Sequence, residues 1–187
     1  ELGYEIYSNG AQTDHLALWD HLMDCGAPHG MEFSSTHALT IRRIEGGILG
    51  NGTDITPDMT PFEAGLAPFV NMDKGDFIGR TALLTKERHC CLFGVTCSTK
   101  TPAAGALVFD GGREVGRITA GIPSPTLGLG VGYVHFNARG DWVGRTLAMR
   151  LPDGSLHDAQ IVQPPFFDPD KKIVRGVDRS IPKRPAN

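Results

Sequence analysis

The spacing of apolar residues predicts alternating strands and helices in the first half of the chain. Apolar side chains alternate with polar ones over residues 1–6, which predicts a half-buried strand. Helical spacing follows, with capping residues before the helices and glycine after them. The expected elements are a helix from Thr13 to Gly26, one capped by Ser34 or Ser35 and ended at Gly46-Gly47, a short one starting at the capping box Thr60-Pro61-Phe62-Glu63, a strand from Phe69 to Met72, and a helix around Gly79 to Lys86.

After Arg88 the pattern changes to short apolar runs separated by turns. Asp110-Gly111-Gly112 and Pro152-Asp153-Gly154 are hairpin signals, so neighbouring strands are expected to be antiparallel. Such short antiparallel strands predict a small Greek-key barrel. The six expected strands are Leu92 to Cys97, Ala106 to Phe109, Glu114 to Thr119, Gly130 to Phe136, Thr146 to Leu151 and His157 to Val162.

Composition narrows the class of protein. Apolar residues make up 40% and charged residues 21% of the 187 positions, as in a globular protein with a hydrophobic core. The net charge of −3 and scattered Lys and Arg residues give no basic surface, so we expect no nucleic-acid partner. Neither a membrane span nor a secretory signal is visible, which predicts no membrane partner and a cytoplasmic location, or the mitochondrial matrix in a eukaryote.

Catalytic motifs that stand on their own are absent from the sequence. There is no phosphate-binding Walker loop, no nucleophile elbow and no zinc-protease histidine pair. Gly128, Gly130 and Gly132 alternate as G-x-G-x-G, which we interpret as one face of a tightly packed strand and not as a dinucleotide site. The seven histidines are dispersed without metal-ligand spacing, so we predict no metal site.

An ordered set of peptides gives the most specific signal. Each is short, but their order and spacing extend across nearly the whole chain. The peptides are Glu1-Leu2-Gly3-Tyr4-Glu5-Ile6, Arg43-Ile44-Glu45-Gly46-Gly47, Gly52-Thr53-Asp54-Ile55-Thr56-Pro57, Thr60-Pro61-Phe62-Glu63-Ala64-Gly65-Leu66, Asp73-Lys74-Gly75-Asp76-Phe77-Ile78-Gly79-Arg80, Gly116-Arg117-Ile118-Thr119-Ala120-Gly121, Pro123-Ser124-Pro125, Gly132-Tyr133-Val134 and Pro165-Phe166-Phe167-Asp168-Pro169. Together they resemble the second half of the folate-binding glycine-cleavage T-protein family.

This resemblance implies an α+β fold. Residues 1–86 would be the C-terminal part of the folate-binding domain, 87–170 the six-stranded antiparallel Greek-key barrel, and 171–187 a tail. It also implies chemistry in which tetrahydrofolate accepts a one-carbon unit from an aminomethyl group, a methylated amine, a thioether or an ether.

Glu5 matches the glutamate with which this family holds the pterin ring. A pterin edge presents a ring N–H beside an exocyclic amine, and one carboxylate can accept both hydrogen bonds. The alternative is a solvated strand glutamate. Tyr4, on the opposite face by strand alternation, is expected in the core.

Arg43 matches the arginine of the family's R-[LI]-E-x-G segment. An arginine at a helix end can bind a ligand carboxylate, or it can cap carbonyls and pair with Glu45. The glycine-cleavage members have another ligand-binding arginine four residues earlier, where this chain has Leu39. That difference favours a demethylase or methylamine-oxidising branch. Asp76 stands where iron–sulfur-assembly relatives have a cysteine, which favours the transferase branch.

Residue 1 is glutamate and opens directly onto the strand-like alternation, so we expect preceding sequence in the complete protein. The family resemblance implies that the catalytic acid lies in that N-terminal half, which would complete the site. These 187 residues alone would then be inactive. Two alternatives stay open: a folate-binding regulatory or interaction module without turnover, and the folate domain of a dimethylglycine- or sarcosine-type oxidoreductase.

Overall fold

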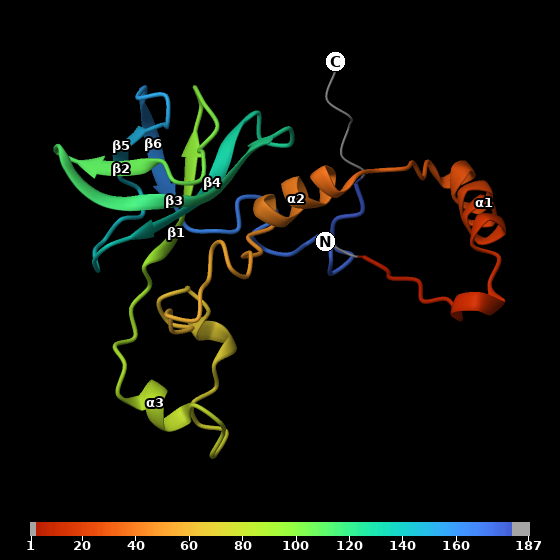
Figure 1. The fold of residues 1–187 in the computed structure, drawn as a ribbon, viewed down its shortest axis with the longest axis horizontal. Coiled ribbons are helices and arrows are strands. Elements are labelled where there is room, and N and C mark those ends of the chain that lie inside the picture. The colour runs from red at the N-terminus through yellow and green to blue at the C-terminus, as the bar shows by residue number, and fades with distance from the viewer. Residues whose placement is uncertain (1–2, 181–187) are drawn as a thin grey trace.

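The computed structural model describes residues 3–180 and divides them into a barrel and a more open first half. In Figure 1, helix α2 (Thr36–Glu45) lies against the barrel, whereas α1 (His15–Gly26) stands apart from it at the end of an extended connection. The segment containing α3 (Arg80–Leu84) forms a separate excursion before the chain enters the barrel. Within the described range, no helix has the length and apolar character that crossing a membrane requires.

The barrel is closed and consists of six antiparallel strands in the order β1-β4-β3-β2-β5-β6. Strands β2, β3 and β4 are consecutive neighbours and β1 returns beside β4, which is a Greek key. The strands are β1 (Leu92–Cys97), β2 (Leu107–Asp110), β3 (Arg113–Ser124), β4 (Leu129–Phe136), β5 (Thr146–Arg150) and β6 (Leu156–Val162). The predicted barrel is confirmed.

The barrel interior is filled by buried apolar side chains from its strands and the connection before β5. Phe136 stacks on Trp142 with ring centroids 4.1 Å apart and meets Phe93 edge-on at 5.8 Å. The other members of this core are Val95, Cys97, Ala106, Val108, Val115, Ile118, Val134, Leu147, Met149, Ala159 and Ile161. Their burial accounts for the apolar alternation of the sequence in this half.

Strand β3 continues five residues beyond the predicted end at Thr119. Its added residues pair with the glycine-rich start of β4, where a connecting segment crosses closely. A Cβ atom on Gly130 would lie 2.5 Å from the Lys100 carbonyl oxygen, and one on Gly121 only 2.0 Å from that of Pro102. The interpretation of Gly130 and Gly132 as part of a tightly packed strand is correct, but Gly128, with a φ of +69°, lies in the preceding turn.

Three helices form in the first half: α1 (His15–Gly26), α2 (Thr36–Glu45) and α3 (Arg80–Leu84), with short 3₁₀ turns at Gly10–Gln12, Ala27–His29 and Ala67–Phe69. Asp14 caps α1 by accepting the N–H groups of Leu16 and Ala17, and Ser35 caps α2. The helix predictions are therefore confirmed at these three places.

Both strands predicted in this half are wrong. Residues 3–9 are extended but form no strand, because no described segment lies alongside to complete a ladder. Tyr4 is 86% exposed and not in the core, and Glu1 and Leu2 lie outside the described residues. The predicted strand at Phe69 to Met72 is instead the end of a 3₁₀ turn followed by loop.

The capping box at Thr60 forms, but no helix follows it. The Thr60 N–H and hydroxyl donate to Glu63 Oε2 at 2.7 and 2.8 Å, and the Glu63 N–H donates back to Thr60 Oγ1. These bonds, the backbone one first, lower the pKa of the Glu63 carboxyl. Gly65 then takes a left-handed φ of +73°, so the turns end before a helix can propagate.

Candidate functional site

Chain segments that are distant in sequence meet at the C-terminal end of α2. Ile44, in the last turn, is buried against Ile122 of β3 and Val131 and Tyr133 of β4. The Tyr133 hydroxyl donates to the carbonyls of Ile44 and Ile48, both at 3.2 Å. Burial, with a contribution from the negative charge of Asp54, raises the pKa of Tyr133 far above its ordinary value. The barrel therefore holds this end of the helix in place.

Glu45 is fully buried, and its carboxylate joins α2 to the β3–β4 turn. Ser124 Oγ donates to Oε1 at 2.5 Å, and Thr126 Oγ1 donates to Oε2 at 3.0 Å. Arg42 completes the set with Nη1 3.1 Å from Oε2. Arg42, not Arg43, is thus the cation that pairs with Glu45.

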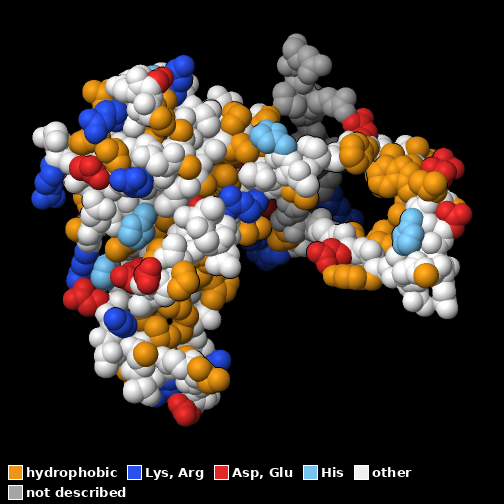
Figure 2. All heavy atoms as spheres, viewed as in Figure 1, with side chains coloured by type: hydrophobic (Ala, Val, Ile, Leu, Met, Phe, Trp, Pro, Cys, Tyr) orange, Lys and Arg blue, Asp and Glu red, His pale blue; other side chains and the backbone are white. Residues whose placement is uncertain are grey.

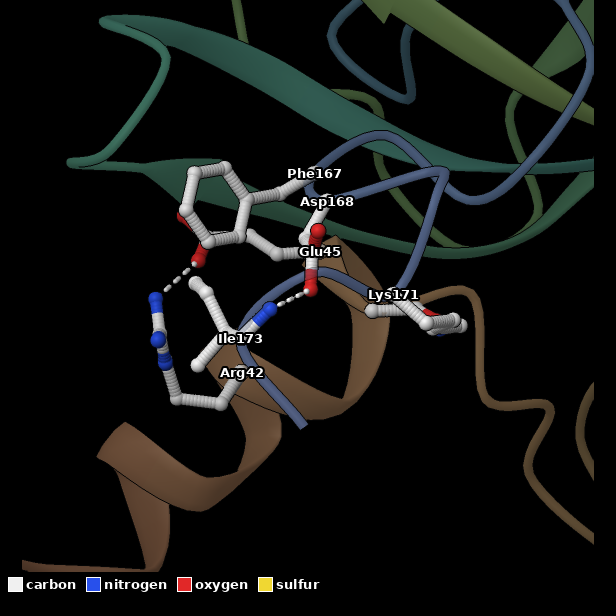
Figure 3. Close-up of a pocket in the computed structure, with 7 residues that line it drawn as sticks. Arg42, Glu45, Phe167, Asp168, Lys171 and Ile173 are labelled. Carbon is white, nitrogen blue, oxygen red and sulfur yellow. Dashed lines mark hydrogen bonds and ion pairs between the residues drawn. The ribbon is translucent and has the colours of Figure 1, made fainter. Parts of the chain in front are cut away.

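The segment after the barrel closes over the same helix end. The Phe166 and Phe167 N–H groups donate to the Glu45 carbonyl at 3.0 and 2.9 Å, and Lys171 Nζ donates to the Gly46 carbonyl. Asp168 orders the following turn by accepting backbone N–H groups, as Figure 3 shows for Ile173. The chain after β6 thus lies against the C-terminal end of α2.

Arg43 faces the other side of the helix end and pairs with Asp54. Its Nη1 donates to the Ile48 carbonyl at 2.8 Å and lies 3.1 Å from Asp54 Oδ2. Asp54 is 1% exposed and also accepts the Gly50 N–H at 2.7 Å and the Thr119 hydroxyl at 2.6 Å. Arg43 thus forms an ion pair, as one of its predicted structural roles required, but with Asp54 and not Glu45, and the carbonyl it binds belongs to Ile48, three residues beyond the end of α2.

Arg43 also lines an open hollow of about 430 Å³, together with Gly3, Leu39, Thr40 and Ile48. Both of its bonds use Nη1, so Nε and Nη2 have no partner among the described residues. The side chain keeps 28% of its surface exposed. An immobilised guanidinium with unused donors at the edge of a hollow can bind a carboxylate or another planar anion.

Glu5 is exposed in the extended N-terminal segment, where its carboxylate accepts the Tyr7 hydroxyl. That bond raises the pKa of Tyr7. Gly3, two residues earlier, lines the hollow beside Arg43, but the Glu5 side chain does not. The structure thus brings the N-terminal segment to Arg43 without placing the two predicted ligand-binding side chains in one pocket.

Sequence reasoning missed three polar residues at this helix end, Asp54, Thr119 and Ser124, and it paired Glu45 with the wrong arginine. The three missed residues belong to the peptides that carry the family resemblance, and that membership was the available signal. Across residues 3–180, no group of three or more His, Cys, Asp or Glu side chains could hold a metal ion.

Comparison with known sequences finds two matches to family models. The GCVT N-terminal domain matches residues 1–74, and the glycine cleavage T-protein C-terminal barrel domain matches residues 88–168. Together they account for most of the chain.

Curated proteins and solved structures are similar to the chain. It is 32% identical over 173 residues to the aminomethyltransferase of Saccharopolyspora erythraea, covering 89% of the chain and 46% of that protein. It is 33% identical over 183 residues to the formaldehyde-forming 4-methylaminobutanoate oxidase of Paenarthrobacter nicotinovorans, covering 94% of the chain and 22% of that protein.

The crystal structure of glycine cleavage system aminomethyltransferase T from Bartonella henselae superposes with a TM-score of 0.70 at 27% identity. The match covers 82% of this chain and 44% of that one. The chain thus spans about half the length of the aminomethyltransferases that it matches.

Proposed function

Because the chain belongs to the glycine-cleavage T-protein family, we propose that it supplies part of a site that transfers a one-carbon unit to tetrahydrofolate. The main support for this proposal is how Arg43 is held and where its other nitrogens lie. Its side chain is fixed by Asp54 and Ile48, yet Nε and Nη2 have no partner within residues 3–180 and lie at the edge of a hollow. Such a group suits an anionic ligand.

We assign two contacts to the folate. Glu5 accepts the ring N–H and exocyclic amine of the pterin, and Arg43 binds a carboxylate of the ligand's glutamate. The position of Gly3 in the Arg43 hollow favours this arrangement, because it brings the segment carrying Glu5 to the same side of α2. Because Glu5 is exposed, a further segment is needed to enclose the pterin.

In this proposal, that segment belongs to the part of the related aminomethyltransferases that the 187 residues do not span. Apolar side chains stand exposed over α1 and the segment around α3, including Leu16 at 79%, Phe69 at 85% and Ile78 at 104%. Figure 2 shows such side chains gathered over the α1 excursion. None of the residues of α1 is buried. An apolar surface of this kind is typical of an interface that another segment covers.

The catalytic acid is assigned to that remaining half, so the 187 residues alone are expected to bind weakly and to be inactive. The one-carbon donor is a small molecule bearing an aminomethyl or methyl group. The similarity to a formaldehyde-forming oxidase favours a methylated amine and makes a folate domain within an oxidoreductase the second candidate. A folate-binding module without turnover would use the same contacts.

A binding titration of the complete gene product that contains these residues tests the proposal. Tetrahydrofolate should bind, and Glu5→Gln should weaken its binding by about 1.5–3 kcal/mol, roughly 10- to 150-fold, because a charge-assisted pair is lost. Glu114→Gln, at an exposed barrel position, is the matched control and should bind as the wild type does. Equal affinity of Glu5→Gln and wild type would remove the assignment of Glu5.

A further inference from the structure

Thr119 lies at an irregularity in the barrel that turns its side chain toward the first half of the chain. In the register of β3 with β4, Ile118 pairs with Val134 and Ala120 with Tyr133, so Thr119 has no partner of its own. Two residues of β3 therefore stand opposite one residue of β4, which is a β-bulge. Bulges change the direction of side chains and occur next to functional sites.

The bulge interrupts the alternation between the inside and the outside of the barrel. Ile118 belongs to the barrel interior, whereas Ala120 packs in the cluster that α2 shares with Tyr133. The Thr119 hydroxyl, between them, donates to Asp54 Oδ1 at 2.6 Å across 65 residues of sequence. A regular strand would not place Thr119 and Ala120 together on the α2 side.

Asp54 is the link between this hydroxyl and Arg43. One carboxylate oxygen accepts Thr119, and the other accepts the Gly50 N–H and Arg43. Gly50 leaves room for this contact, since a Cβ atom there would lie 2.4 Å from Thr53 Oγ1, 3.1 Å from Asp54 Oδ2 and 3.3 Å from Arg43 Nη1. Both oxygens of the buried Asp54 carboxylate therefore accept hydrogen bonds. These bonds fix the orientation in which the carboxylate meets the Arg43 guanidinium.

We propose that Thr119 and Asp54 are positioning residues that hold Arg43 for the ligand carboxylate, which makes the barrel a working part of the folate site. The inference rests on the function proposed above. It assigns to β3 a role in ligand affinity although no β3 side chain lines the hollow. Fixing the arginine before binding removes the entropy loss that the ligand would otherwise have to offset.

The test compares Thr119→Val and Thr119→Ser in the complete gene product. Valine keeps the shape and the net charge but leaves Asp54 Oδ1 without its donor, whereas serine keeps the hydroxyl. Two probes are titrated: tetrahydrofolate, and 6-methyltetrahydropterin, which lacks the carboxylate tail. We expect Thr119→Val to bind tetrahydrofolate about 3- to 10-fold more weakly, the loss for one side chain that must be ordered on binding. The pterin probe should bind unchanged, and Thr119→Ser should match the wild type.

The outcomes separate this inference from the proposed function. Failure of the wild type to bind tetrahydrofolate removes the proposed function and the inference with it. Three results with a wild type that binds would contradict the positioning role and leave the proposed function standing. Thr119→Val could bind tetrahydrofolate as tightly as the wild type, or it could bind both probes more weakly by the same factor. Thr119→Ser could also bind tetrahydrofolate as weakly as Thr119→Val. If Thr119→Val does not fold, Gly50→Ala disturbs the Asp54–Arg43 contact from the other side and should show the same selective loss.

Discussion

Replacing Phe136 with alanine is expected to lower the free energy of unfolding of the barrel by about 3–5 kcal/mol. Phe136 is fully buried at the end of β4, stacked on Trp142 and edge-on to Phe93. The deletion removes transfer free energy, both ring contacts and the packing that holds Trp142. A closed six-stranded barrel can move little to fill the cavity. The loss of unfolding free energy should therefore lie within the range usual for replacing a buried phenylalanine with alanine.

Urea unfolding followed by tryptophan fluorescence measures this effect. Leu156→Ala is the control, because this side chain on strand β6 of the same barrel is 64% exposed and its loss should change stability by less than about 0.5 kcal/mol. A Phe136→Ala chain within 1 kcal/mol of the control would contradict the packing described for the barrel core.

Replacing Glu45 with alanine is expected to lower the free energy of unfolding by about 3 kcal/mol. The substitution removes the acceptor of Ser124, Thr126 and Arg42. Ser124 is 3% exposed, so its hydroxyl would lose a charge-assisted bond without gaining water. Arg42, with 37% of its side chain exposed, can be resolvated, which keeps the effect below that of a fully buried ion pair.

The same urea experiment applies, with Glu114→Ala as the exposed control. A double-mutant cycle with Ser124→Ala should show coupling between the two sites of roughly 1–2 kcal/mol, because they share a bond. Additive losses would mean that the Glu45 carboxylate does not join α2 to the β3–β4 turn as described.

The barrel strands were predictable because the sequence signals for each strand lie within the strand itself and its adjoining turns. Period-2 alternation and glycine turns place β1 at its observed bounds and the others within two residues, apart from the far end of β3. There, Gly121 and Pro123 resemble a turn, but they pair with Gly132 and Gly130 of β4, so the strand continues. The first half was less predictable: residues 1–6 alternate as a strand does and Phe69 to Met72 were also predicted as a strand, but residues 3–6 and 69–72 have no described partner to pair with.

The candidate site could be predicted only in part. Arg43 was identified from the R-I-E-G-G peptide, but its pairing with Asp54 and Thr119 depends on tertiary packing across the chain. Glu45 was the expected partner of Arg43 because it is the acid nearest in sequence. Its carboxylate accepts Ser124 instead, because residues 43 and 45 lie on different faces of the helix.

The most direct test of the central claim is transfer of a labelled carbon to tetrahydrofolate by the complete gene product. The donors are small molecules with a ¹³C-labelled one-carbon group: a set of aminomethyl compounds and a set of N-methylated amines. We predict that one donor yields ¹³C-methylene- or methyl-tetrahydrofolate with the wild type, and that the product falls at limiting folate with Glu5→Gln. Tetrahydrofolate that binds to the wild type but stays unlabelled with every donor would contradict one-carbon transfer and indicate a folate-binding module without turnover.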